Sequence, residues 1–294
     1  MLTFITFLFS SFFMVEDIDI YRYPALSPDG SQLAFSYQGD IWTVGTQGGR
    51  ANRLTIHEAY DSRPQWSPDG NQILFSSARN GNNDLYVMSA NGDQLNRLTY
   101  HSSSDTDGNW IDDETISFST RRDFIAVERE SEFHTVKVSG GTPERTMKSL
   151  GSDGNFSGDH QLMAYVRGGC RIEREAYVGP ANRDIWVYDP DAKTYSEITS
   201  FDGQDVMPEW GEGKNLYFLS ARNGKYNIHH TLLGNNNEAG EIKAITQFED
   251  QGIRIFDVSA DGSTMVYIHG MEVYIHNIAS GGREKINIEV TKDY

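Results

Sequence analysis

The fold is decided by the stretch from Arg63 to Thr99, which reads RPQWSPDGNQILFSSARNGNNDLYVMSANGDQLNRLT. Its Ser67-Pro68-Asp69-Gly70 segment suits a type I turn, because proline presets φ at the second position and glycine accepts the positive φ at the exit. Runs of apolar, β-branched and aromatic residues on both sides predict strands. Two more breaks, at 80–83 and 91–93, separate two further strands. The stretch therefore predicts a four-stranded antiparallel meander of about 40 residues.

Weaker copies of this stretch fill nearly the whole chain. Aligned on the residue before the turn, six copies are anchored on Leu26, Trp66, Trp110, Phe156, Trp210 and Val258. A four-stranded sheet of this size cannot bury both of its faces alone, so neighbouring copies must stack face to face. Radial repetition closes such a stack into a ring. The sequence therefore predicts an all-β, six-bladed β-propeller of four-stranded antiparallel blades.

The propeller is expected to occupy residues 16–294. Its blades are expected at about 24–55, 63–99, 107–147, 153–199, 207–246 and 255–290. Each blade would run from its innermost to its outermost strand, so no strand would be shared between blades one and six. Side-chain packing would then close the ring, unless 18–23 adds a strand. The aromatic residues before the turns are expected to wedge between blades and not to serve as ligand platforms.

Composition limits the classes of partner. A formal net charge of −17 argues against nucleic acid and anionic membranes, because phosphate contacts need clustered Lys and Arg. Acidity by itself identifies no positive partner, since it also serves solubility. Cys170 is the only cysteine, so no intrachain disulfide can form, and we interpret it as a small buried side chain.

The N-terminus carries an apolar run, residues 2–15, followed directly by acidic residues. The run is shorter than the ~20 residues that cross a bilayer and matches the apolar region of a secretory signal. No Lys or Arg precedes it, and no clear small-x-small cleavage site follows. We expect residues 1–15 to be a signal segment and the protein to be periplasmic or secreted. A mis-set start codon and a retained N-terminal anchor remain open alternatives.

Motifs for catalysis or metal binding are lacking in this sequence. It contains no Gly-x-Ser-x-Gly elbow, no His-Glu-x-x-His and no cysteine pair suited to zinc. Asp105, Asp107 and Asn109 alternate like the start of a calcium loop, but the other ligands are missing at the required spacing. We interpret them as part of a loop rich in turn formers. We therefore predict no catalytic residue, no metal and no cofactor in this chain.

Candidate binding residues follow from the repeats. A feature that recurs once per blade is expected to be structural, as for the acids that open the third strands, Asp40, Asp84 and Asp184. Features confined to one blade are better candidates for a ligand site. They are the two arginines of a charged loop in blade three and two arginines of a long insertion, residues 168–183, in blade four: Arg121, Arg122, Arg171 and Arg174.

With the repeats laid out, the chain resembles the TolB-type propeller family, whose blades carry runs like Trp-Ser-Pro-Asp-Gly, Ile-Leu-Phe-Ser-Ser and Leu-Tyr-Val-Met of blade two. It is more similar to the N-terminal six-bladed propeller of tricorn-type peptidases. That similarity rests on 23–30, 37–42, 97–101, 205–210 and 216–224. It covers about residues 20–290.

The resemblance implies a non-catalytic propeller that gates or guides peptides toward an active site elsewhere. In that family a second propeller, a PDZ-like module and a serine-peptidase domain follow, and they contain the catalytic residues. We therefore expect this chain to be a fragment of a hydrolase. Its expected partners are peptides or polypeptides and the downstream domains, with homo-oligomerisation a further expectation. Two alternatives stay open: a freestanding TolB-like protein-interaction scaffold, and a propeller enzyme that acts on a sugar or ester in its own channel.

Overall fold

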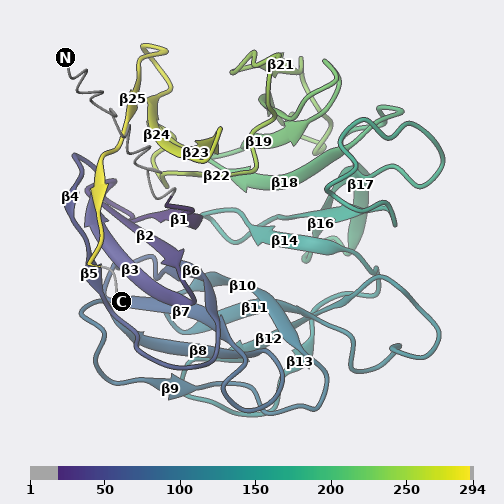
Figure 1. Cartoon of the computed structure of the whole chain (residues 1–294). Helices are drawn as coiled ribbons and strands as arrows, with labels where there is room; N and C mark the ends of the chain where they lie inside the picture. The colour runs from purple at the N-terminus through teal and green to yellow at the C-terminus, as the bar shows by residue number, and fades with distance from the viewer. Residues whose placement is uncertain (1–18, 292–294) are drawn as a thin grey trace, which may run out of the picture.

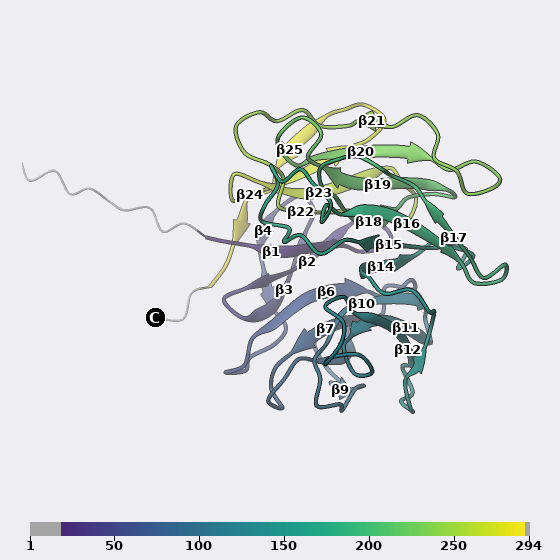
Figure 2. The ribbon, with the colours of Figure 1, turned by 90° about the vertical axis from the view of Figure 1, so that its right-hand side faces the viewer.

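A computed structural model describes residues 19–291 of the chain. Six four-stranded antiparallel sheets surround a central axis, and each sheet contains strands that are consecutive in the sequence (Figure 1). The first strand of each sheet lies nearest the centre. Figure 2 shows the same ring from its side. The predicted all-β, six-bladed propeller is confirmed.

The first three blades are built from short strands. Blade one contains β1 (Arg22–Leu26), β2 (Gln32–Tyr37), β3 (Asp40–Gly45) and β5 (Asn52–Arg53), with β4 (Gly49–Arg50) beside them. Blade two contains β6 (Asp61–Trp66), β7 (Gln72–Ser77), β8 (Asp84–Ser89) and β9 (Asn96–Arg97). Blade three contains β10 (Asp105–Asp112), β11 (Thr115–Thr120), β12 (Glu132–Lys137) and β13 (Glu144–Arg145).

The other three blades repeat this order. Blade four contains β14 (Ser152–Phe156), β15 (Met163–Arg167), β16 (Asp184–Asp189) and β17 (Thr194–Glu197). Blade five contains β18 (Asp205–Trp210), β19 (Asn215–Ser220), β20 (Asn227–Leu232) and β21 (Lys243–Ala244). Blade six contains β22 (Ile255–Val258), β23 (Thr264–His269), β24 (Glu272–Asn277) and β25 (Arg283–Lys285), and β26 (Ile288–Glu289) follows it.

The turn between the first two strands of a blade has the expected chemistry. The N–H of Gly30 donates to the carbonyl of Ser27 at 2.8 Å, and the Ser27 hydroxyl donates to Asp29 at 2.6 Å. Gly30 has a φ of +67°, which a residue with a side chain adopts only at a cost. Blade two repeats these contacts around Gly70. Local sequence therefore fixes the turn in the way that the repeat predicted.

Tryptophan side chains before the turns lie between blades, as predicted. Trp66, Trp110 and Trp210 are between 7% and 9% exposed. Each indole N–H donates to a main-chain carbonyl of the preceding blade, at 2.9 to 3.2 Å. Because a buried indole N–H needs an acceptor, this bond fixes the position of the ring as well as its burial. The tryptophans therefore join adjacent blades.

Closure of the ring differs from the prediction of side-chain packing alone. β26 pairs in parallel with β4, so the C-terminal segment lies along the outside of blade one (Figure 1). The N–H of Gly49 donates to the carbonyl of Asn287, and the N–H of Ala51 donates to that of Glu289, both at 2.8 Å. Of residues 18–23, considered as an added strand, Arg22 and Tyr23 belong to β1 of blade one and residues 19–21 form no strand, while residue 18 lies outside the described residues. Main-chain hydrogen bonds therefore help to close the ring.

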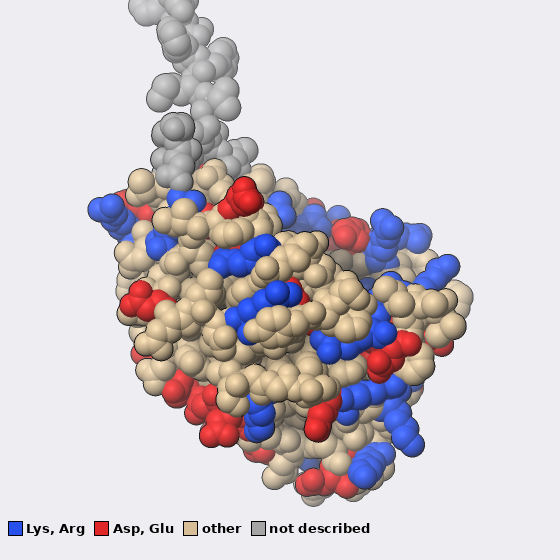
Figure 3. Space-filling view, turned by 90° about the horizontal axis from the view of Figure 1, so that it is seen from below, with Lys and Arg blue, Asp and Glu red and all other residues tan. Residues whose placement is uncertain are grey.

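The surface mixes charges of both signs. Seen from below the view of Figure 1, Lys and Arg side chains are interspersed with Asp and Glu, despite the net charge of −17 (Figure 3). No helix within residues 19–291 is long and apolar enough to cross a membrane. The expected signal segment, residues 1–15, lies outside the described residues.

Candidate functional site

The central channel is lined by the first strands of the six blades. In five of them the residue three places before the turn anchor has a left-handed backbone, with φ between +51° and +55°: Tyr23, Arg63, Asp107, Asp153 and Met207. The register of the strand pair shifts next to each of them, which marks a β-bulge. Blade six has Ile255 at this position, without a positive φ or a register shift. The bulges give five blades a common device for aiming a variable side chain.

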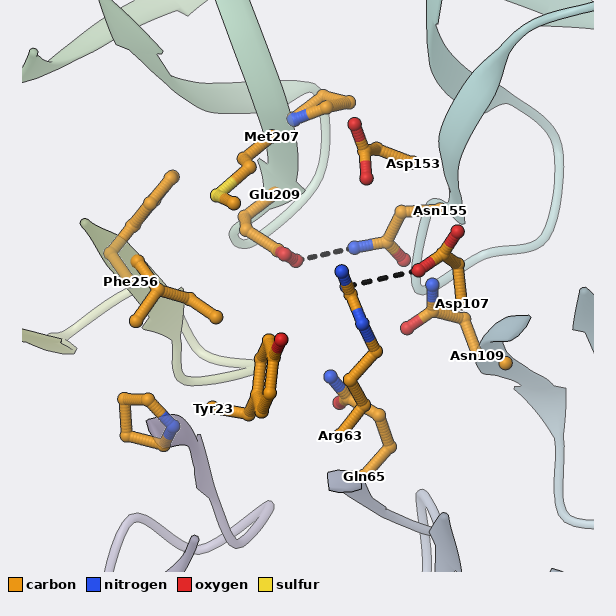
Figure 4. Close-up of a pocket in the computed structure, with 14 residues that line it drawn as sticks. Tyr23, Arg63, Gln65, Asp107, Asn109, Asp153, Asn155, Met207, Glu209 and Phe256 are labelled. Carbon is orange, nitrogen blue, oxygen red and sulfur yellow. Dashed lines mark hydrogen bonds and ion pairs between the residues drawn. The ribbon is translucent and has the colours of Figure 1, made fainter. Parts of the chain in front are cut away.

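A second set of residues precedes the turn anchors directly. It consists of Ala25, Gln65, Asn109, Asn155, Glu209 and Asp257. Most of these side chains surround one small cavity together with those of the bulge position (Figure 4). The cavity measures about 70 Å³, and we call it the waist. It has room for a few water molecules but not for a polypeptide chain.

Ion pairs and hydrogen bonds cross the waist between blades. The Arg63 guanidinium of blade two lies 2.9 Å from the Asp107 carboxylate of blade three and 4.7 Å from the centre of the Tyr23 ring of blade one. The Asn155 amide of blade four donates to the Glu209 carboxyl of blade five (Figure 4). These contacts link blades one, two and three, and separately blades four and five, at the narrowest part of the channel.

Carboxyl groups outnumber cations at the waist. Burial raises the pKa of Glu209 well above its ordinary value, and the nearby carboxyls of Asp257 and Asp153 raise it further. Burial raises the pKa of Asp257 to about 6. Burial and the neighbouring Asp107 also raise the pKa of Asp153. Burial and the neighbouring carboxyls therefore make these groups harder to ionise than exposed carboxyls.

The channel widens on both sides of the waist. The cavity on the side of the first turns measures about 270 Å³, and we call it the turn mouth; the buried tryptophans form part of its wall. The cavity on the opposite side measures about 690 Å³, and we call it the loop mouth. Its wall is largely apolar and contains Ile20, Tyr21, Ile172, Met207, Tyr226, Ile253, Ile255, Ile268 and Met271. A pocket of this size and character is suited to an organic ligand.

Three arginines also contact the loop mouth. Arg63 is paired with Asp107, whereas no ion pair joins Arg22 or Arg254 to another of the described residues. Glu173, from the insertion of blade four, is the acidic residue of this wall. The loop mouth therefore combines an apolar wall with a small number of charged groups, above a waist rich in carboxyls.

The two candidate arginines of blade three are engaged within the blade. Arg122 lies 2.6 Å from the buried carboxylate of Asp105, and the same pair recurs in other blades as Arg79 with Asp61 and Arg222 with Asp205. Arg121 donates to the carbonyl of Glu128 at 2.5 Å and holds its own loop. Neither arginine lines the channel cavities. Arg122 thus belongs to a recurring pair, although the sequence suggested a feature of one blade.

The candidate arginines of blade four lie on the insertion, residues 168–183. Arg171 is exposed, and the guanidinium of Arg174 lies 4.7 Å from the centre of the Tyr177 ring. The insertion itself reaches the channel, because Ile172 and Glu173 contribute to the loop mouth. Binding by the four arginines stays a prediction: Arg171 and Arg174 flank Ile172 and Glu173 in the sequence but do not line the loop mouth themselves.

The channel-lining residues differ from the candidates that the sequence suggests. Asp107 and Asn109, predicted to be part of a loop, lie on β10 and line the waist. The sequence does contain a signal for them. The position three residues before the turn anchor differs in chemistry from blade to blade, as with Arg63 and Met207, although the anchor itself repeats. Variation at a constant position of a repeat indicates residues that are not needed for the repeat itself.

Metal binding finds no support in the described part of the chain. Within residues 19–291 no group of three or more His, Cys, Asp and Glu side chains is arranged to hold a metal ion. The adjacent His229 and His230 face different partners, since His229 contacts the carbonyl of Asn227 and His230 the side chain of Asn215.

Comparison with known proteins connects this architecture to a family. The model of the tricorn protease N-terminal β-propeller domain matches residues 18–282. The chain belongs to this family. This tricorn-type N-terminal propeller is 24% identical over 279 residues to a tricorn protease homolog of Saccharolobus solfataricus. The aligned region covers 93% of this chain and 25% of that relative. The chain thus spans about a quarter of that relative's length.

Solved structures show the same fold. The tricorn-type propeller superposes on the crystal structure of the tricorn protease with a TM-score of 0.78 at 19% identity, over 94% of this chain and 27% of that one. It superposes on a putative TolB from Agrobacterium tumefaciens with a TM-score of 0.64 at 17% identity, over 85% of this chain and 91% of that one. Both parts of the resemblance drawn from the sequence, to tricorn-type and TolB-type propellers, are confirmed at the level of the fold.

Proposed function

We propose that this propeller is a non-catalytic module that gates or guides peptide substrates in a tricorn-like serine peptidase, with the catalytic domain in a part of the protein that this chain does not contain. The observation that carries the proposal is the shape of the channel. A loop mouth of about 690 Å³ narrows to a waist of about 70 Å³. Such a channel admits the end or a side chain of a peptide at the mouth and stops a polypeptide at the waist.

The groups that close the waist come from different blades. Arg63 and Asp107 form an ion pair between blades two and three, and Glu209 and Asn155 form a hydrogen bond between blades five and four. Passage of a chain requires these contacts to separate, so they are the gate in this proposal. The apolar wall of the loop mouth supports transient contacts with peptide side chains, because burial of apolar area favours binding without a fixed sequence.

Peptide hydrolysis tests the proposal. We expect a mixed peptide library to be cleaved by the full-length gene product and not by this propeller alone. Cleavage by the propeller alone would place a catalytic site in the channel and overturn the proposal. A full-length product that lacks a peptidase domain would favour the alternative of a TolB-like scaffold.

A variant of the channel tests the gate. Ile255 lines both the waist and the loop mouth, so Ile255→Trp fills space in both. In the full-length protein we expect Ile255→Trp to reduce kcat/KM for long peptides several-fold, while a short reporter peptide is cleaved at the ordinary rate. The matched control is Leu232→Trp, at an exposed position outside these cavities. Equal kinetics of the two variants on long peptides would contradict a role for the channel.

Export to the periplasm or outside the cell, peptide substrates and homo-oligomerisation remain part of the proposal. The family supports a parent protease with further domains. Fractionation of cells that express the full-length gene would test the predicted location.

A further inference from the structure

Blades one and two neutralise the acid at the start of the third strand in the same way. In blade one Asp40 on β3 lies 2.5 Å from Arg53 on β5. In blade two Asp84 on β8 lies 2.7 Å from Arg97 on β9. Both acids are buried, and an arginine beside a buried carboxylate offsets part of the cost of burying its charge. The pair of a third-strand acid and a fourth-strand arginine is therefore part of the repeat.

Blade four keeps the acid and the threonine contact that accompany this pair but not the arginine. The N–H of Ile185 donates to the Thr199 hydroxyl at 2.9 Å, as the N–H of Leu85 donates to the Thr99 hydroxyl at 3.0 Å in blade two. The acid is present as Asp184. At the position of Arg97, however, the chain carries Glu197. A carboxylate thus replaces the guanidinium beside Asp184.

Within residues 19–291 no other cation forms an ion pair with Asp184. Across the seam to blade five lies Asp205, which is fully buried and has its own partner, Arg222, at 3.0 Å. Arg183, next to Asp184 in the chain, points to Asp153 at 3.7 Å. Arg167, the cross-strand neighbour of Asp184 on β15, lies over the Trp186 ring at 4.9 Å. The described residues contain no ion pair to Asp184.

The seam between blades four and five therefore has an uncompensated acid where the seam between blades one and two has none. In the latter, Asp40 and Asp61 face Arg53 and Arg79. In the former, Arg222 pairs with Asp205, and Asp184 has the charges of Asp205 and the exposed Glu197 near it. Burial, followed by the charges of Asp205 and Glu197, raises the pKa of Asp184 to about 7. A proton on Asp184 would remove the charge that Arg53 and Arg97 compensate in blades one and two.

Asp184 directly follows the insertion that reaches the loop mouth. We call residues 182–184, where the insertion joins β16, its foot. The Asn182 amide donates to Asp184 at 3.0 Å and to the carbonyl of Phe201 at 2.6 Å. The N–H of Asp205 donates to the carbonyl of Arg183 at 2.9 Å. Asp184 therefore lies beside the main-chain contact that attaches the insertion to blade five.

The far end of the insertion also rests on blade five. Glu175 pairs with Lys225 at 3.1 Å, and the Tyr226 hydroxyl donates to the carbonyl of Ile172 at 3.0 Å. Ile172 and Glu173 form part of the wall of the loop mouth. Movement of the foot would thus be transmitted to the entrance of the channel.

We propose that Asp184 is a pH-sensitive latch: protonated, it holds the foot of the blade-four insertion against blade five, and when it ionises, repulsion from Asp205 and Glu197 loosens the foot and opens the loop mouth. The latch concerns the insertion and is independent of what the mouth binds. Three blades begin the third strand with an Asp: blades one, two and four. Only the Asp of blade four lacks an arginine partner among the described residues.

Hydrogen exchange of the insertion, residues 168–183, tests the latch by comparing the wild-type propeller with Glu197→Arg, which restores the arginine of blades one and two. The ratio of the two exchange rates at the same pH removes the intrinsic pH dependence of exchange. We expect a ratio near one at about pH 5.5 and a ratio of at least about three at about pH 8.5. Equal ratios at both pH values would overturn the proposal.

Two further variants separate the latch from a general loss of structure. The side chain at position 184 carries no charge at any pH in Asp184→Asn. The ratio of the exchange rates of the insertion in Asp184→Asn and in Glu197→Arg should therefore be the same at both pH values. Arg97→Glu copies the arrangement of blade four into blade two, and exchange of residues 78–84 relative to wild type should then rise with pH. Failure of Arg97→Glu to create this dependence would contradict the proposed cause.

Discussion

The carboxylate of Asp257 on β22 accepts a hydrogen bond from the main-chain N–H of Leu26 on β1 at 2.7 Å, and so joins two strands whose residues are 231 positions apart. Its other oxygen accepts from the N–H of Val258 at 2.9 Å. At three other seams a tryptophan indole makes the polar bond between first strands, for instance from Trp66 to the carbonyl of Ala25. Blade one has Leu26 at the tryptophan position, so a carboxylate provides the link at the closing seam.

Removal of this carboxylate should weaken the closed ring. We expect Asp257→Ala to lower the free energy of unfolding by about 1–3 kcal/mol, because the buried N–H of Leu26 loses its acceptor. Asp257→Asn keeps one acceptor oxygen and should cost less. Urea unfolding followed by tryptophan fluorescence would measure both. Equal stability of Asp257→Ala and the wild type would exclude this bond as a closing contact.

The pairing of β26 with β4 should contribute to closure as well. A Cβ at Gly48, where φ is +83°, would lie 2.6 Å from the carbonyl oxygen of Asn287. Gly30 has a similar φ of +67° and open space around it, so Gly30→Ala measures the backbone cost alone, about 1–2 kcal/mol. Gly48→Ala should destabilise the fold by more than Gly30→Ala in thermal unfolding. Equal melting temperatures would mean that the C-terminal segment adds nothing to closure.

The role of Arg122 can be separated from that of Arg171. Arg122→Ala would leave the fully buried carboxylate of Asp105 without its partner, and we expect a loss of about 3–5 kcal/mol. Arg171→Ala, at an exposed position, should leave the free energy of unfolding within about 0.5 kcal/mol of the wild type. Chemical denaturation checks both. An Arg122→Ala variant of full stability that loses peptide binding would instead support the ligand role predicted from the sequence.

Stability should depend on pH through Asp184. Its pKa is about 7 in the fold against an ordinary value of 3.8, so between these values the folded state binds more protons than the unfolded state. The free energy of unfolding should therefore fall as pH rises from about 4 to about 7. Because solvent reaches part of the side chain, the expected loss is about 1–2 kcal/mol. Asp184→Asn should remove this contribution. If the free energies of unfolding of Asp184→Asn and the wild type differ by the same amount at pH 4 and pH 7, the pH dependence does not come from Asp184.

The repeat was predictable because it is written in local chemistry. The Ser-Pro-Asp-Gly turn that ends at Gly70 and the alternating strands beside it form through contacts within one blade, and six copies leave the propeller as the arrangement that buries their faces. The burial of Trp66 followed from the same reasoning. The site was less accessible: Arg63 and Asp107 lie 44 positions apart, and a sequence read blade by blade does not show that they meet across the channel.

The sequence by itself determined the blade, its turns, the number of blades and the family, since each depends on patterns that repeat every 40 to 54 residues. Only the tertiary structure decided how the ring closes and what lines its centre. The bulges aim Tyr23 and Met207 inward, and β26 meets β4 from the opposite end of the chain. Those contacts join residues that are distant in sequence, so their energies appear only once the blades have stacked into a ring.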